Sequence, residues 1–206
     1  MKVLMISGSP HKDGSTKRAL LEIEKELTKK EIETIFYQIP LKPLQSCTAC
    51  GLCRNSKDNL CTINDCVNEI IALVKECDGI VVGSPVHFAG ITGGLKIVLD
   101  RLFYCARPIF MNKPFVGVVI ARRAGTTSAL EQLNKYPIIA HMLLLGSQYW
   151  PMVFGNNALE LEEDPEGLQV MRSLGRRMAW VVKMLSDSKQ ELPVEEEGLR
   201  TNFVKI

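Results

Sequence analysis

The stretch Lys2-Val3-Leu4-Met5-Ile6-Ser7-Gly8-Ser9-Pro10 decides the fold, because it joins a short apolar run to a turn. A short apolar run that ends at turn residues is typical of a strand buried on both faces of a parallel sheet. Beyond the turn, apolar residues recur at the spacing of one helix face, at Ala19, Leu20, Ile23 and Leu27. The chain therefore begins with a predicted strand, turn and helix.

The rest of the chain alternates between these two kinds of element. Strands are expected at residues 32–39, 80–83, 115–121 and 148–154, and helices at residues 67–77, 94–103, 127–145 and 167–185. Such alternation predicts a parallel sheet with helices on both faces. Right-handed connections then give an α/β fold of the doubly wound, flavodoxin-like kind, with five parallel strands in the order 2-1-3-4-5.

One domain is expected at residues 1–185, with a cysteine-rich insertion at residues 44–66 after the second strand. Residues 186–206 show little periodicity and include the charged run Glu195-Glu196-Glu197, so we expect an exposed tail. The apolar residues of this tail, which suit a subunit contact, are Leu199, Phe203, Val204 and Ile206.

Composition excludes several classes of protein. The 206 residues are 46% apolar and 23% charged, which is ordinary for one soluble globular core. A net charge of +2 gives no electrostatic reason to expect nucleic acid as a partner. No apolar run approaches the roughly 20 residues that span a bilayer, and the first turn comes too early for a signal peptide. We therefore expect a cytoplasmic protein that does not enter membranes.

The turn after the first strand, residues 7–16, has the features of a phosphate-binding loop. Its two glycines permit close backbone approach, and Ser9, Ser15 and Thr16 supply hydroxyl groups beside a helix N-terminus. The spacing matches neither the loop of nucleoside triphosphatases nor the dinucleotide fingerprint. An ordinary serine-capped helix is the alternative. Position favours phosphate, because ligands of open α/β sheets bind at the carboxyl ends of the strands.

Two later loops emerge at the same edge of the predicted sheet, at residues 83–90 and 121–126. The segment from Pro85 to Phe88 offers backbone donors and an apolar face, which together suit a planar ring. His87 could equally be a solvated loop residue. Arg122 and Arg123 could be surface charges or could hold an anionic ligand.

Five of the seven cysteines fall within twenty residues. In a chain expected to be cytoplasmic, such a group favours metal binding or redox chemistry over disulfides. The spacing Cys47-x2-Cys50-x2-Cys53-x7-Cys61 suits a four-iron four-sulfur cluster, which needs four converging thiolates. Tetrahedral zinc and unmetallated thiols are the alternatives.

The remaining cysteines are assigned by their surroundings in the sequence. Cys66 competes with Cys61 as the fourth ligand, and a zinc site could use both of them. Cys77 and Cys105 fall near predicted helix ends and are expected to be inert and buried. Because the cysteine segment leaves the carboxyl end of the second strand, it is expected near the ligand loops.

Three groups of residues together resemble the NADPH-dependent FMN reductase family. They are Ser7-Gly8-Ser9-Pro10 with Gly14-Ser15-Thr16, then Gly83-Ser84-Pro85-Val86-His87-Phe88, then Gly94-Leu95-Lys96 with Leu99-Asp100-Arg101. The cysteine run is similar to that of the iron-sulfur flavoproteins within this family. The resemblance spans roughly residues 1–185, and two departures from the family pattern are His87, where many relatives carry Tyr, and Asp65-Cys66, where relatives often carry two acidic residues.

The resemblance implies a flavodoxin-like domain that holds FMN and a 4Fe-4S cluster. The FMN phosphate would lie on Ser9, Ser15 and Thr16, and the ring against residues 85–88 and the loop around Gly125. The residues expected to contact FMN are Ser7, Ser9, Pro10, Ser15, Thr16, Pro85, Val86, His87, Phe88 and Gly125, and the cluster ligands are Cys47, Cys50, Cys53 and Cys61. The resemblance also implies a homodimer or homotetramer.

The function expected from this reading is a flavin-dependent oxidoreductase that relays electrons. Reduced ferredoxin or NAD(P)H would supply them, the cluster and FMN would pass them on, and a small-molecule acceptor such as a quinone would receive them. No acid–base pair or nucleophile stands out, so no catalytic side chain is assigned. The alternatives are an NAD(P)H-dependent FMN or quinone reductase without a cluster, and a regulatory binding module shaped by zinc.

Overall fold

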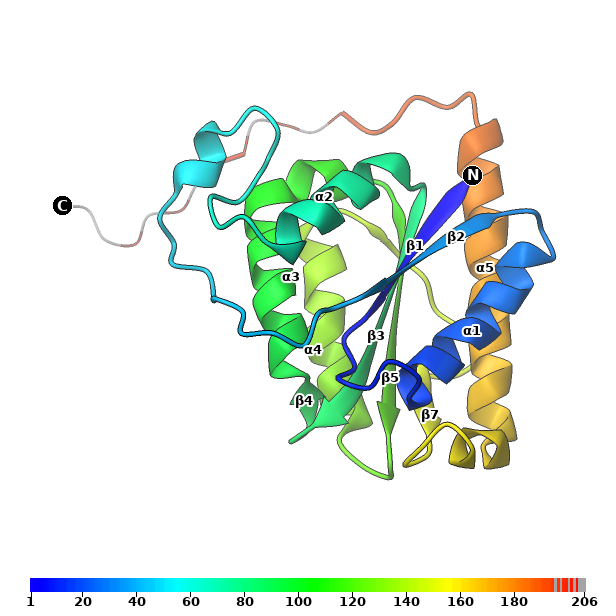
Figure 1. The fold of residues 1–206 in the computed structure, drawn as a ribbon. Coiled ribbons are helices and arrows are strands. Elements are labelled where there is room, and N and C mark those ends of the chain that lie inside the picture. Colours follow the sequence, from blue (N-terminus) through cyan, green and yellow to red (C-terminus); the bar gives the residue numbers. More distant parts are fainter. Residues whose placement is uncertain (195, 197, 200, 202, 204–206) are drawn as a thin grey trace.

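A computed structural model describes residues 1–194, 196, 198, 199, 201 and 203 of the chain. One twisted sheet lies between two layers of helices (Figure 1). The sheet consists of β1 (Lys2–Ser7), β2 (Glu33–Gln38), β3 (Gly79–His87), β4 (Gly90–Ile91), β5 (Pro114–Ala121), β6 (Leu143–Leu144) and β7 (Met152–Phe154). Its main strands are parallel and run in the order β2-β1-β3-β5, and both β6 and β7 pair with the outer side of β5. This arrangement confirms the predicted doubly wound fold.

Helices α1 (Ser15–Thr28) and α5 (Pro165–Asp187) cover one face of the sheet. Helices α2 (Cys66–Glu76), α3 (Gly93–Ala106) and α4 (Thr126–Ile139) cover the other face (Figure 1). Single 3-10 turns lie at Leu52–Asn55, Arg107–Phe110 and Glu160–Glu163. None of the helices in the described part of the chain is both long and apolar enough to cross a bilayer.

The side-chain alternation of β1 divides the core into two halves. Leu4 and Ile6 pack with the helices α2, α3 and α4, whereas Val3 and Met5 pack with α1 and α5. All four side chains are fully buried or nearly so. A strand buried on both faces needs a continuous apolar run rather than an alternating one, which is what residues 3–6 supply.

The register of β1 brings several loops to one edge of the sheet. Ser7, the last residue of β1, lies opposite Gln38 of β2 and Gly83 of β3. β1 and β2 therefore end at the same level, and they end beside β3, which continues past them to His87. This edge is at the bottom of Figure 1.

Two predicted element boundaries are wrong. The strand predicted at residues 80–83 does not stop before Pro85 but continues to His87 as β3, because β1 has already ended opposite Gly83 and no neighbour on that side needs the missing N–H. The helix predicted to reach residue 145 ends at Ile139 instead. His141 then adopts the left-handed conformation (φ 54°), and residues 143–144 form β6.

The predicted fifth strand is shorter than expected. Of residues 148–154, only Met152–Phe154 form a strand on β5, and residues 146–150 leave the sheet between β6 and β7. The assignment of residues 1–185 as one domain and of the tail as a subunit contact stays a prediction. Leu199 and Phe203 are exposed, whereas Val204 and Ile206 lie outside the described residues.

The close packing of α1 on α5 depends on Gly175. A Cβ atom at this position would lie 2.7 Å from the carbonyl oxygen of Ile23 and 2.8 Å from the Cβ atom of Glu26. Because a backbone oxygen cannot move aside cheaply, we expect Gly175→Ala to lower the free energy of unfolding by about 1–3 kcal/mol. Urea unfolding measures this loss. Gly94→Ala is the matched control, because the space in front of Gly94 is open and the change should stabilise the helix by up to about 1 kcal/mol. Equal losses in both variants would contradict this description of the helix packing.

Candidate functional site

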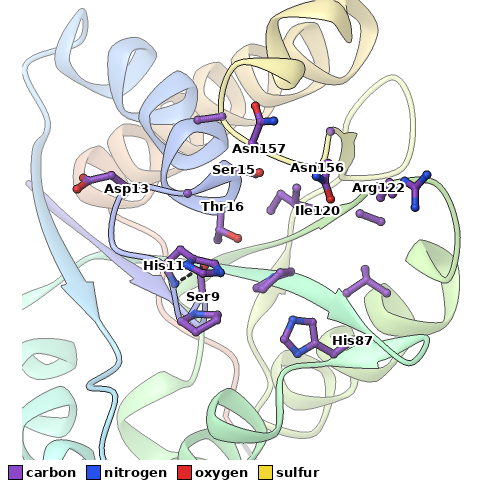
Figure 2. A pocket seen from close by; sticks show the side chains of 17 residues that line it. Ser9, His11, Asp13, Ser15, Thr16, His87, Ile120, Arg122, Asn156 and Asn157 are labelled. Atoms are coloured by element: carbon purple, nitrogen blue, oxygen red, sulfur yellow. Dashed lines mark hydrogen bonds between the residues drawn. The ribbon is translucent and has the colours of Figure 1, made fainter.

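A cavity of about 540 Å³ opens at the carboxyl edge of the sheet (Figure 2). Its walls are the loops that follow β1, β5 and β7, together with the last residues of β3 and β5. The residues lining this flavin-edge cavity are Ser9, Pro10, His11, Asp13, Gly14, Ser15, Thr16, Pro85, Val86, His87, Ile120, Ala121, Arg122, Gly155, Asn156, Asn157 and Ala158. The cavity lies where the topology of an open α/β sheet places a ligand.

One wall of the flavin-edge cavity is the N-terminus of α1, and it is equipped to hold an anion. In the part of the chain that the structure describes, no side chain caps the first turn of this helix, which begins after Gly14. The Oγ1 atom of Thr16 has no hydrogen-bond partner among the described residues, although the residue is only 1% exposed. Buried hydroxyl groups nearly always have a partner. A phosphate seated on the helix N-terminus would satisfy both the hydroxyl and the free backbone N–H groups.

Seven of the ten predicted FMN contacts line this cavity together. They are Ser9, Pro10, Ser15, Thr16, Pro85, Val86 and His87. The Ser9 hydroxyl accepts a hydrogen bond from the backbone N–H of His11 at 3.1 Å, which fixes the turn (Figure 2). His87 faces this group from the end of β3 (Figure 2).

The other three predicted contacts lie outside the cavity wall. Ser7 is fully buried beneath the loop, and its hydroxyl accepts the N–H of Ser9 at 3.4 Å. Phe88 is fully exposed at the turn between β3 and β4. Gly125 has a φ of +84° and packs so closely on Ala89 that a Cβ atom would lie 2.9 Å from its Cα atom. Ser7 and Gly125 therefore support the loops that form the cavity wall without lining the cavity themselves.

A second cavity of about 450 Å³ adjoins the first, and its lining is mostly apolar. It lies between the loop after β2 and the N-terminus of α3. The lining residues are Gly8, Ser9, Pro10, Ile39, Pro40, Leu41, Lys42, Pro43, Leu44, His87, Thr92, Gly93, Gly94, Leu95 and Ile97. Ser9, Pro10 and His87 line both cavities, so a ligand in one would be a near neighbour of a ligand in the other.

The four predicted cluster ligands line one pocket together. Cys47, Cys50, Cys53 and Cys61 share it with three residues of α3, namely Arg101, Tyr104 and Cys105. A hydrogen bond from the backbone N–H of Leu52 lowers the pKa of the Cys50 thiol. Burial raises the pKa of Cys53, as does the neighbouring Cys61.

The remaining three cysteines are buried, as predicted for two of them. Cys66 begins α2, is fully buried and does not line the pocket. Burial raises its pKa to about 11, and Asp65 adds to this effect. Cys105 does line the pocket, which the sequence did not indicate, and burial raises its pKa to about 12. Both groups are protonated thiols at neutral pH.

The donor atoms of the thiol pocket suit an iron-sulfur cluster, but the volume of the pocket is too small for one. Its volume is about 20 Å³, which is room for about one water molecule and far too little for a cluster of four iron and four sulfur atoms. Within the described residues, no three His, Cys, Asp or Glu side chains are arranged so that they could hold a metal ion. Four cysteines facing one pocket are nevertheless the donor set that such clusters use. The cysteine loop would have to open to admit a cluster.

The cysteine pocket does not lie at the flavin edge, contrary to the expectation from the sequence. The segment leaves that edge after β2 but then turns back along α3 towards the opposite end of the molecule (Figure 1). Leu44, Cys53 and Cys61 pack against the core between α2 and α3, which holds the segment there. From Gly93 in the second cavity to Cys105 at the thiol pocket, α3 rises by about 18 Å.

Comparison with known proteins places the chain in a family. Residues 1–157 match the family model described as NADPH-dependent FMN reductase. The chain belongs to the NADPH-dependent FMN reductase family. An iron-sulfur flavoprotein of Methanocaldococcus jannaschii is 32% identical over 197 residues, which cover 90% of this chain and 99% of that protein. An iron-sulfur flavoprotein of Methanosarcina thermophila is 28% identical over 93% of this chain and 100% of its own length.

Solved structures agree on the fold. A flavone reductase superimposes with a TM-score of 0.71 at 18% identity, over 93% of this chain and 66% of that chain. A flavodoxin, WrbA-like protein from Agrobacterium tumefaciens superimposes with a TM-score of 0.60 at 16% identity, over 89% and 97% of the two chains. As a member of the FMN reductase family, this chain is a flavin-dependent oxidoreductase, and its flavin is FMN.

Several cavity residues of this FMN reductase family member were missed from the sequence. Asn156 and Asn157 follow the short strand β7 and line the cavity, as do Ile120 and Arg122 (Figure 2). The Asn157 side chain itself is hydrogen-bonded to Glu160. The signal was available, because every parallel strand ends at the ligand edge and the loop after the fifth strand therefore faces the same cavity. Arg122 lines the cavity whereas Arg123 does not.

The unpartnered hydroxyl of Thr16 provides a test of the phosphate site. Thr16→Val keeps the side-chain shape but removes the hydroxyl, so FMN should bind a few-fold to tenfold more weakly, since one hydrogen bond is worth about 1 kcal/mol. The FMN-free protein should become slightly more stable, because a buried unsatisfied group is lost. Fluorescence titration and thermal unfolding measure the two effects. Thr28→Val, at the exposed end of the same helix, should change neither, and unaltered FMN affinity in Thr16→Val would contradict the assignment.

Proposed function

We propose that this chain relays electrons from a donor through a four-iron four-sulfur cluster and FMN to a small-molecule acceptor. The observation that carries the proposal is the pocket that Cys47, Cys50, Cys53 and Cys61 line together. This pocket lies against α3, the same helix that borders the flavin edge. Two relatives aligned over nearly their whole length are iron-sulfur flavoproteins, which supports the same assignment. The donor would be a ferredoxin or NAD(P)H.

We assign the FMN phosphate to Ser9, Ser15 and Thr16, and the isoalloxazine ring to the wall formed by residues 85–87. When bound, FMN accepts either a hydride or single electrons, so it can join a two-electron reaction to a one-electron carrier. The protein's part is to hold the phosphate at the α1 N-terminus and to orient the ring. Phe88, which is fully exposed beside this wall, would act at the rim of the ring site, and Gly125 would hold the neighbouring loop against residues 86–89.

We assign the cluster to Cys47, Cys50, Cys53 and Cys61, which would bind four iron atoms through thiolates. Two observations support Cys61 over Cys66 as the fourth ligand. Cys61 lines the pocket, whereas Cys66 is fully buried outside it and its raised pKa, about 11, opposes the thiolate form.

We place the acceptor in the second cavity. Its apolar lining suits a planar, weakly polar molecule such as a quinone, and Lys42 offers a positive charge at the wall. The three residues shared with the flavin-edge cavity would bring such a molecule next to the flavin. We further expect a cytoplasmic homodimer or homotetramer.

The second candidate function is an NAD(P)H-dependent FMN or quinone reductase that binds no cluster. The small volume of the thiol pocket favours this candidate, because about 20 Å³ leaves no room for four iron atoms without a change in the loop. A regulatory module shaped by zinc has no support from the FMN reductase family match.

Matched cysteine variants test the cluster assignment. Protein purified without oxygen should contain iron and acid-labile sulfide near four per chain, and Cys61→Ser should lose most of both, because serine is a poor ligand for iron-sulfur clusters. Cys66→Ser is the control and should keep the cluster, since Cys66 lies outside the pocket. The opposite pattern would make Cys66 the fourth ligand. Wild-type protein that holds FMN but neither iron nor absorbance near 400 nm would support the second candidate function instead.

Filling the second cavity tests the acceptor site. A Cβ atom at Gly94 would meet nothing within 4 Å, so Gly94→Leu can place its side chain in the cavity without a backbone clash. Reoxidation of the reduced flavin by a quinone should slow at least tenfold, while FMN binding and reduction by the donor stay within twofold of wild type. Stopped-flow absorbance measures both half-reactions. Gly146→Leu, where the space is also open but away from both cavities, is the control. Unchanged reoxidation in Gly94→Leu would exclude this cavity.

A further inference from the structure

A guanidinium group is buried beside the thiol pocket. Arg101 lies in the second half of α3, and its side chain is 0% exposed. It forms a two-pronged ion pair with Asp65, in which Nη1 donates to Oδ2 at 2.6 Å and Nη2 donates to Oδ1 at 2.9 Å. Burial opposes the charged form, but Asp65 and Cys61 keep the pKa of Arg101 above its usual range. A buried charge is tolerated only with such partners.

The same guanidinium binds both ends of the cysteine segment. Its Nη2 atom, whose two hydrogens are shared among three acceptors including Asp65, donates to the Sγ atom of Cys61 at 3.4 Å and to the carbonyl oxygen of Ile63 at 2.9 Å. Its Nη1 atom donates to the carbonyl oxygen of Gln45 at 3.3 Å. Gln45 precedes Cys47 and Ile63 follows Cys61, so one side chain of α3 closes the loop that carries all four thiols.

The contact with sulfur singles out Cys61. Among the hydrogen bonds of the described residues, Cys61 is the one thiol that receives a donor from a cationic side chain. Arg54, on the outer side of the loop, donates instead to the Tyr104 hydroxyl at 3.0 Å. The charge nearest a proposed ligand sulfur is therefore held inside the protein, where solvent does not screen it.

We propose that Arg101 positions Cys61 as the fourth cluster ligand and raises the reduction potential of the cluster through its N–H···S hydrogen bond. The inference rests on the proposed function. Hydrogen bonds to ligand sulfurs and nearby positive charge stabilise the state that carries the extra electron, and groups that hold a metal ligand in place tune the metal. The electron would come from the ferredoxin or NAD(P)H donor, and no proton or bond change at Arg101 is required. Arg101 is thus a positioning residue.

Asp65 allows the ion pair to be dismantled without losing the fold. Its carboxylate accepts the N–H of Val67 at 3.1 Å as the N-cap of α2. Asparagine is an equally good N-cap residue, so Asp65→Asn should keep this helix end. The double variant Asp65→Asn with Arg101→Gln removes both charges together and leaves no buried ion without a partner.

The test is a potentiometric titration of the cluster, followed by electron paramagnetic resonance, in the anaerobic full-length protein. In the double variant the reduction equilibrium should shift about tenfold towards the oxidised cluster, which for one electron corresponds to about 59 mV. Asp65→Asn alone keeps the bond to Cys61 and removes the compensating negative charge. It should therefore shift the potential in the opposite direction.

Two controls distinguish an effect of Arg101 on the reduction potential from a purely structural effect on the cysteine segment. Arg54→Gln removes an exposed positive charge near the same pocket and should leave the potential within the error of the titration. Arg101→Lys keeps the positive charge but loses the guanidinium fork, so the reduction potential of this variant should fall between those of the wild type and the double variant. Retained FMN binding in every variant shows that the fold is intact.

The contradicting results are distinct from those that concern the proposed function. Full iron content with an unchanged potential in both the double variant and Asp65→Asn would overturn the inference. Loss of iron from the double variant with an unchanged potential in Asp65→Asn would reduce Arg101 to a structural anchor and also overturn it. Wild-type protein without any cluster would instead overturn the proposed function.

Discussion

The parallel pairing of β1 with β2 and β3 is the constraint on which the flavin site depends. Because Ser7 lies opposite both Gln38 and Gly83, β1 and β2 end at one level and their loops lie beside the last residues of β3, which continues to His87. Gly83 adds a second requirement, since a Cβ atom there would lie 2.9 Å from the Cγ2 atom of Thr16. The missing side chain lets the first turn of α1 rest on β3. A buried hydroxyl and an uncapped helix N-terminus consequently face the flavin-edge cavity, ready for a phosphate group.

Helix α3 connects this edge to the thiol pocket. Its N-terminus borders the second cavity, and its other half carries Arg101 and Cys105. The thiols are therefore held by the same rigid element that shapes the flavin edge, although the two sites lie towards opposite ends of it. Burial of the Arg101–Asp65 pair is costly without partners, so the hydrogen bonds from Arg101 to Gln45, Cys61 and Ile63 favour one arrangement of an otherwise irregular loop. The Arg101 guanidinium therefore both fixes the path of the cysteine segment and contacts Cys61, a proposed cluster ligand.

The fold and most of the flavin-edge cavity could be predicted from the sequence because both depend on local patterns. The apolar run of residues 3–6, the turn after it and the alternation of elements are visible in short windows. The course of the cysteine segment was not predictable in this way. It is fixed by contacts between Arg101 and residues 36 to 56 positions away, and by burial against α2 and α3. Arg101 was visible only as part of a family motif, and its partners appear only once the chain has folded. The end of β3 was misjudged for a similar reason, because the effect of Pro85 depends on where the neighbouring strand stops.

The central claim is that one chain holds both FMN and a four-iron four-sulfur cluster. Native mass spectrometry of the protein, purified without oxygen, tests it most directly, because it weighs the folded chain together with what it has bound. The account predicts a mass per subunit equal to the chain plus one FMN plus one 4Fe-4S unit. A subunit that carries FMN with zinc, or FMN with no metal at all, would contradict it.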